Sequence, residues 1–67
     1  MEEKAFRFKL NKNDGCGQFV KIRKLIEENG GEHLYDAIYP LTEINGNMNA
    51  SVTYRANKEI MIKKGEL

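Results

Sequence analysis

The hydrophobic pattern of this chain changes its period after the first few residues, and this change most constrains the fold. Phe6, Phe8 and Leu10 alternate with Arg7 and Lys9. A period of two with aromatic residues is typical of a strand that buries one face. The polar, glycine-rich residues 11–17 follow and indicate a loop. A strand that leads through a short loop into a segment of another period predicts a mixed α and β fold.

The second segment has helical periodicity. The spacing predicts a helix over residues 17–29 whose apolar stripe is Phe19, Ile22, Leu25 and Ile26, with Val20 off the stripe. We expect Asn13 or Asp14 to cap its start, and Asn29-Gly30-Gly31 to supply a left-handed stop.

Residues 32–37 fit both a helical turn and an extended connector, and we expect a strand from near Ala37, since Pro40 disfavours helix in the residue before it. The dipeptide Asn45-Gly46 predicts a hairpin turn. Regular pairing about this turn sets Tyr39 opposite Val52. The predicted inner face then consists of Tyr39, Leu41, Met48, Ala50, Val52 and Tyr54.

A further strand is predicted near the end of the chain. Ile60 and Ile62 alternate, and they join the face of Val52 and Tyr54 only if the loop before them has an odd length. We therefore expect a loop over residues 56–58, with Asn57 or Lys58 left-handed in a bulge. Residues 63–67 form a polar tail.

These elements predict a single small α+β domain over residues 1–67, in the order β-α-β-β-β. One helix packs on one face of a mainly antiparallel four-stranded sheet. The sequence leaves the order of the strands within this sheet open.

The composition excludes several classes of protein. With 67 residues, one cysteine and one histidine, the chain can form neither an internal disulfide nor a zinc site of Cys/His type, and we expect no metal and no cofactor. The net charge of +1 argues against a polyanion mimic and gives little support to a dedicated nucleic-acid binder. No secretory signal or membrane span is evident, so we expect a cytoplasmic protein. The many Asn, Lys, Glu and Ile residues are typical of AT-rich genomes, such as low-GC bacteria and phages.

One candidate site is the loop before the helix. Backbone N–H groups converge at the start of a helix and favour an anion. The candidate residues are Lys12, Gly15, Cys16, Gly17 and Lys21. Cys16 in this place is also a candidate nucleophile or redox sensor. The alternative interpretation is a glycine-rich turn without a ligand, because the loop lacks the Lys-Ser/Thr ending of a phosphate-binding loop.

A second candidate site lies on the sheet face that points away from the helix. Its basic residues are Arg7, Lys9, Arg55 and Lys63. They are positioned to follow a phosphate backbone, although sheets that bind RNA add exposed aromatic residues, and Phe6, Phe8 and Tyr54 share the core face instead. The alternative is a charged face that contacts only water.

The third candidate is an interaction surface, and it carries the leading hypothesis. The residues expected to expose apolar area are Tyr35, Tyr39, Ile44 and Met61. The alternative is that Tyr39 closes the core and Tyr35 lies on its rim. No complete catalytic constellation is present, and we interpret His33 as a solvated loop residue. We therefore expect a non-enzymatic interaction module that binds a protein partner or a second copy of itself, with nucleic-acid or phosphate binding and a thiol activity as alternatives.

Overall fold

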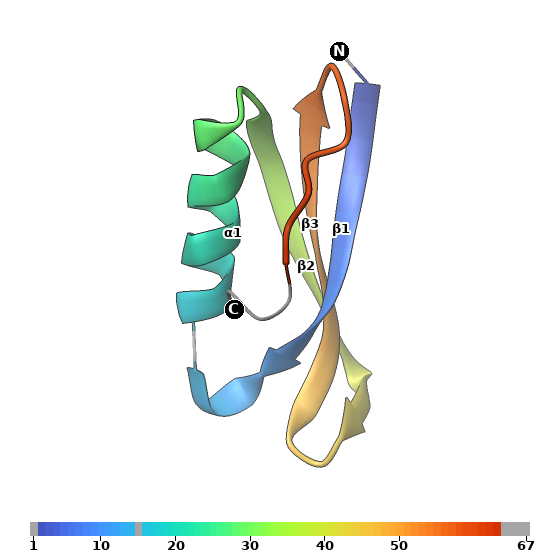
Figure 1. Ribbon diagram of the computed structural model, residues 1–67. Helices are drawn as coiled ribbons and strands as arrows, with labels where there is room; N and C mark the ends of the chain where they lie inside the picture. Colours follow the sequence, from blue (N-terminus) through green and yellow to red (C-terminus); the bar gives the residue numbers. More distant parts are fainter. Residues whose placement is uncertain (1, 15, 64–67) are drawn as a thin grey trace.

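The computed structural model describes residues 2–14 and 16–63 as a three-stranded sheet with one helix packed against it (Figure 1). β3 lies between β1 and β2 and pairs antiparallel with both. The small α+β class is thereby confirmed, whereas the predicted order β-α-β-β-β with four strands is wrong. The elements are β1 (Glu2–Asn11), a 3-10 turn η1 (Lys12–Asp14), α1 (Gly17–Glu28), β2 (Glu32–Ile44) and β3 (Asn47–Ala56).

The helix α1 begins and ends close to the predicted bounds. Its buried stripe contains Phe19, Ile22 and Ile26, and the chain leaves it through Gly30 with φ of 80°. The predicted side-chain cap is wrong, because Cys16 occupies the capping position and makes no capping hydrogen bond. Gln18 anchors the helix start instead: its buried amide accepts the N–H of Asn11 at 2.7 Å and donates to the Lys9 carbonyl at 3.2 Å.

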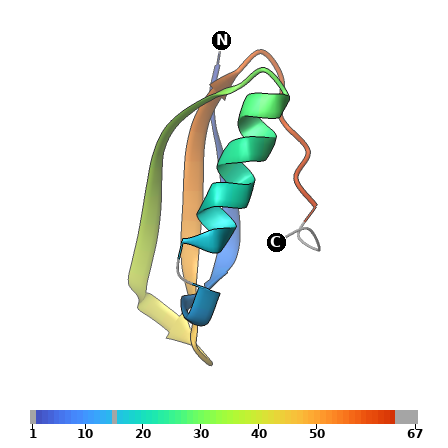
Figure 2. The same ribbon diagram turned by 90° about the vertical axis from the view of Figure 1, so that its left-hand side faces the viewer.

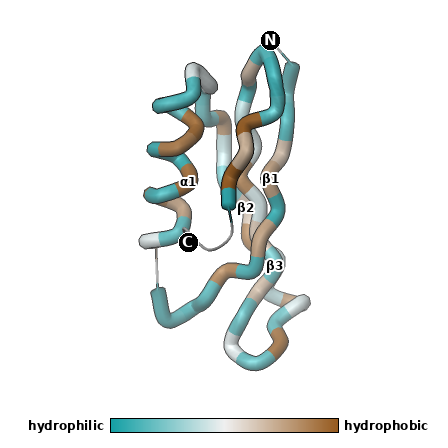
Figure 3. The backbone as a smooth tube through the Cα atoms, in the orientation of Figure 1, coloured by the Kyte–Doolittle hydropathy of each residue, from teal (hydrophilic) through white to brown (hydrophobic). Residues whose placement is uncertain are grey.

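One face of the sheet carries the hydrophobic core. The helix and the segment after β3 lie beside each other over this face (Figure 2), and both contain hydrophobic positions (Figure 3). Phe8 packs edge-to-face against Phe19, with ring centroids 5.4 Å apart. The buried members of the core are Phe8, Leu10, Phe19, Ile22, Ile26, Ala50, Val52, Tyr54, Ala56 and Ile60.

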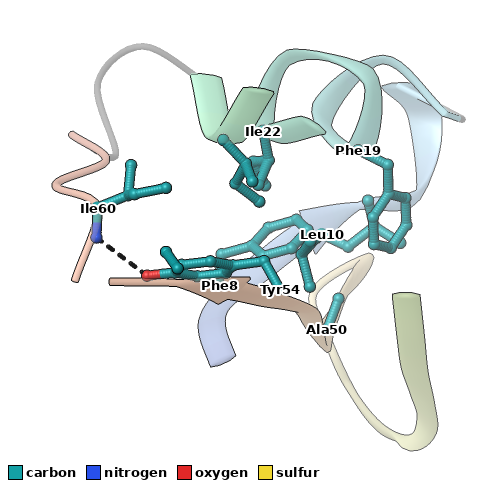
Figure 4. Close-up of a cluster of buried hydrophobic side chains, with 10 residues drawn as sticks. Phe8, Leu10, Phe19, Ile22, Ala50, Tyr54 and Ile60 are labelled. Atoms are coloured by element: carbon teal, nitrogen blue, oxygen red, sulfur yellow. Dashed lines mark hydrogen bonds between the residues drawn. The ribbon is translucent and has the colours of Figure 1, made fainter. Parts of the chain in front are cut away.

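The segment after β3 replaces the predicted fourth strand. Residues 57–63 bend back over the core face instead of pairing with the sheet, and neither Asn57 nor Lys58 has a positive φ. Ile60 is nevertheless buried above Tyr54, whose hydroxyl accepts the N–H of Ile60 at 3.1 Å (Figure 4). The isoleucines are therefore on the expected face, but they contribute to a second layer and not to the sheet.

β2 differs from the expected strand in its start and in its register. It begins at Glu32, so the predicted connector before Ala37 is strand as well. The turn at Asn45-Gly46 is confirmed, and φ values of 52° and 81° identify it as type I′. Two irregularities then shift the pairing, one at Leu34 and one between Tyr39 and Ile44.

The second irregularity reverses the β2 part of the predicted inner face, whereas Met48, Ala50, Val52 and Tyr54 of β3 lie on the core side as predicted. Four residues, 40–43, lie opposite the single residue Met48, so three extra residues move Tyr39 to the other side of the sheet. Tyr39 pairs with Asn49 instead of Val52, and Leu41 is fully exposed. Pro40 cannot donate to the ladder. The Thr42 hydroxyl bridges the two strands in the bulge: Oγ1 accepts the Asn49 N–H at 3.1 Å and donates to the Tyr39 carbonyl at 2.6 Å.

Candidate functional site

The sheet face that α1 does not cover, called the open face below, is organised in rows across the three strands. The first row is Lys9–Asn49–Tyr39 and the second is Arg7–Ser51–Ala37. The third row is Ala5–Thr53–Tyr35 and the fourth is Glu3–Arg55–Glu32. Ser51 and Thr53 are buried although no helix lies over them, and each has one long neighbour in its row, Arg7 and Tyr35 respectively.

The two predicted interface tyrosines lie on this open face. Tyr35 is 54% exposed and Tyr39 is 48% exposed, and both belong to β2. The sequence placed Tyr39 in the core, and no signal except Pro40 indicated the bulge that moves it. The open face therefore has exposed aromatic residues on the same side of the sheet as Arg7 and Lys9, where none was expected from the sequence.

β2 is an edge strand of unusual composition. Among the strands that the structure describes it pairs with β3 alone, and residues 32–44 contain no lysine or arginine. Natural edge strands often carry lysine, which discourages pairing with another chain. The other edge strand, β1, follows that rule with Lys4, Arg7 and Lys9. The large exposed hydrophobic residues of β2 are Tyr35, Ile38, Tyr39, Leu41 and Ile44.

The remaining predicted interface residue lies elsewhere. Met61 is 84% exposed but belongs to the segment after β3, on the side of the sheet that carries the core. Ile38 and Leu41, absent from the predicted interface, extend the exposed apolar area of β2 beyond Tyr35, Tyr39 and Ile44.

The basic residues predicted for a nucleic-acid surface separate into three environments. Arg7 and Lys9 are neighbours on the open face, where Lys9 donates to Asn49 Oδ1. Arg55 lies in the row of two acidic residues, with its guanidinium 4.0 Å from Glu32. Lys63 follows β3 outside the sheet, so it does not share the face.

The loop before α1 holds a carboxylate at the place expected for an anion. A Cβ atom added at Gly17 would lie 2.8 Å from Asp14 Oδ2, so this side chain lies against the first residue of the helix. Lys12 forms an ion pair with Glu43 of the hairpin, and Cys16 is an exposed free thiol. Lys21 is exposed on the helix, and Gly15 lies outside the described residues.

His33 is not a loop residue, because it belongs to β2. Its Nε2 lies 2.7 Å from Asp36 Oδ1, and Asp36 Oδ2 lies 3.5 Å from the guanidinium of Arg23 on α1. This cluster joins the helix to β2. His33 follows the end of the helix and Cys16 precedes its start, so the 12 residues of α1 separate them by about 18 Å and exclude a Cys–His pair.

Comparisons with protein-family models, with curated proteins and with solved structures gave no significant match. In the described ranges, 2–14 and 16–63, no three His, Cys, Asp or Glu side chains gather in a way that would hold a metal ion. The one helix of these ranges is too short and too polar to cross a bilayer.

Proposed function

We propose that this chain is a non-enzymatic interaction module and that β2 is the strand through which it associates with a second copy of itself. The observation that carries the proposal is the contrast between the two edges of the sheet. β1 carries three lysine or arginine side chains, whereas β2 carries none and exposes five large hydrophobic residues. Between its two bulges, residues 35–39 of β2 contain Asp36 as the one charged side chain and no proline.

The open-face residues in the regular part of β2 are self-complementary. Between the two bulges, residues 35–39 read Tyr-Asp-Ala-Ile-Tyr, with Ala37 at the centre. Antiparallel pairing of two copies about Ala37 puts each Tyr35 opposite Tyr39 of the partner subunit, on one face of a continuous six-stranded sheet. Directly opposed aromatic pairs stabilise an antiparallel ladder by about 0.2–1 kcal/mol each.

The short length of this stretch sets the strength of the association. Five residues of strand edge bury less area than the roughly 1,200–2,000 Å² of a stable interface. We therefore expect a dimer that forms reversibly with increasing protein concentration, over a range of about 1 μM to 1 mM.

Charge substitutions at the centre of the pairing test the proposal. In an Ala37→Asp variant two carboxylates face each other across the two-fold axis, and in an Ala37→Lys variant two ammonium groups do so, so each variant alone is expected to be monomeric. A mixture of the two is expected to restore the dimer. Ala5→Asp is the matched control, because Ala5 is exposed on the same face of the other edge strand.

The readout is the mass in solution by light scattering after size-exclusion chromatography. If the Ala37 variants associate like the wild type, or if only Ala5→Asp abolishes association, β2 is not the interface. If the wild type stays monomeric and binds a different protein through β2, the proposal of self-association is wrong and the partner of β2 has another sequence.

A further inference from the structure

A hollow of about 540 Å³ lies on the open face, between the C-terminal half of β1 and the bulge of β2. Its volume falls within the range of about 300–1,000 Å³ that is usual for small-ligand sites. Seven residues line it: Arg7, Phe8, Lys9, Tyr39, Thr42, Asn49 and Ala50. Phe8 and Ala50 belong to the buried core, so the exposed polar and aromatic groups of the hollow come from the other five.

The arrangement of these side chains follows from the register of the sheet. Lys9, Asn49 and Tyr39 form one row across three strands, and Arg7 is the next open-face residue of β1. Neighbouring strands are about 4.8 Å apart, so the cationic side and the aromatic side of the hollow are separated by about 10 Å at the backbone. The amide of Asn49 lies between them.

The charges around the hollow favour an anion. Arg7 has no ion-pair partner in the described part of the chain, and Lys9 is held by a neutral amide oxygen. The acidic residues of the open-face rows, Glu3 and Glu32, lie two rows beyond Arg7 and flank Arg55. Because Asn49 Oδ1 accepts from Lys9, its NH₂ group retains hydrogens for another acceptor.

We propose that this hollow binds single-stranded nucleic acid. A base stacks on the ring of Tyr39, its polar edge accepts a hydrogen bond from the Asn49 amide, and Arg7 and Lys9 bind the adjacent phosphates. This inference does not require the pairing of β2 proposed above, but both proposals use Tyr35 and Tyr39 on the open face.

A second tyrosine distinguishes a strand from a free nucleotide. Tyr35 is exposed on the same face, four residues before Tyr39 on β2, which corresponds to about 13 Å along the strand. It offers a second stacking position that a single nucleotide in the hollow leaves unused. The proposed ligand is therefore a short single strand that runs along β2.

Fluorescence anisotropy of a labelled uridine decamer tests the proposal in buffers from low to moderate salt. With two phosphates neutralised, log K is expected to fall with log salt with a slope of about −1.4, and Arg7→Gln is expected to reduce this slope by about 0.7. Loss of one stacked base in Tyr39→Ala is expected to weaken binding about 5- to 150-fold, whereas Tyr39→Phe retains most of it.

Lys24→Gln is the matched control, because it removes the same charge from the exposed side of α1. No binding at low salt overturns the proposal, as does a Tyr39→Ala variant that binds like the wild type. Equal weakening by Lys24→Gln and Arg7→Gln indicates non-specific charge attraction and also overturns it. If uridine monophosphate binds as tightly as the decamer, the single-strand assignment is wrong.

Discussion

The segment after β3 is predicted to be an essential part of the core, and Ile60→Ala tests this directly. Ile60 is 6% exposed, packs with the buried cluster and donates its N–H to the Tyr54 hydroxyl. The substitution removes three buried carbon atoms. At about 0.8 kcal/mol per methylene group the transfer cost is about 2.4 kcal/mol. The cavity left behind adds to it, and the total is expected within the range of about 2–5 kcal/mol that is usual for Ile→Ala in a core.

This loss is large relative to the stability of so small a protein. At roughly 0.05–0.15 kcal/mol per residue, a chain of 67 residues has an unfolding free energy of about 3–10 kcal/mol. Each kcal/mol corresponds to about 4–8 °C in Tm for a domain of this size. We therefore expect Ile60→Ala to lower the Tm by at least about 10 °C in a thermal scan followed by circular dichroism.

Met61→Ala is the matched control, because the neighbouring side chain is 84% exposed. We expect it to change the unfolding free energy by less than about 0.5 kcal/mol. Equal effects of the two substitutions would show that residues 57–63 do not pack on the core, and the description of the second layer would then be wrong.

Three further substitutions test local features, each by urea unfolding. Gln18→Ala removes the partner of the Asn11 N–H, so we expect a loss of about 1–3 kcal/mol, and an unchanged midpoint would contradict the anchoring role. Gly31→Ala brings a Cβ within 2.8 Å of Ile26 and Ile60 side chains and is expected to cost about 1–3 kcal/mol; no loss would mean that these side chains yield without strain. Thr42→Val removes both hydrogen bonds of the bulge, and we expect about 0.5–2 kcal/mol together with faster amide exchange at Asn49. Unchanged protection at that amide would refute the role of Thr42.

The helix and the hairpin turn were predictable because each depends on local sequence. Phe19, Ile22 and Ile26 recur at the helical period, and Gly30 provides the positive φ that ends the helix. Asn45-Gly46 accommodates two consecutive positive φ values, which few other residue pairs do. Neither feature requires knowledge of what lies opposite in the sheet.

Which residues of β2 face the core was not predictable in the same way, because it depends on how many residues of β2 lie opposite each residue of β3 in the bulge. Parity arguments assume regular pairing, and three extra residues at positions 40–43 reverse the side on which Tyr39 lies. Pro40 is compatible with a regular edge strand as well as with a bulge, so it does not decide between them.

The prediction of a fourth strand was wrong for a related reason. Ile60 and Ile62 would alternate in the same way in a strand of the sheet and in an extended segment laid over it, since both bury every second residue. The hydrogen bond from the Ile60 N–H to the Tyr54 side chain, in place of a backbone ladder, is a tertiary feature. Because this segment lies outside the sheet, Lys63 is not on the open face, where the sequence predicted it.

The candidate site follows from these two corrections. The sequence identified Tyr35, Arg7 and Lys9 as separate candidates, but only the reversed register brings Tyr39 onto the face of the two basic residues. The lack of lysine in residues 32–44 was visible in the sequence. It indicates an edge open to pairing only because β2 is an edge strand, and the sequence left the strand order open.

The most direct test of the central claim is the mass of the wild-type protein in solution, measured by light scattering between about 1 μM and 1 mM and compared with Ala37→Asp. The account predicts a mass that rises with concentration from monomer to dimer and stops there, and an Ala37→Asp variant that stays monomeric. A monomer over the whole range, or open-ended growth beyond the dimer through pairing of β2 with β1 of the next copy, would contradict the assignment of β2 as a two-fold interface.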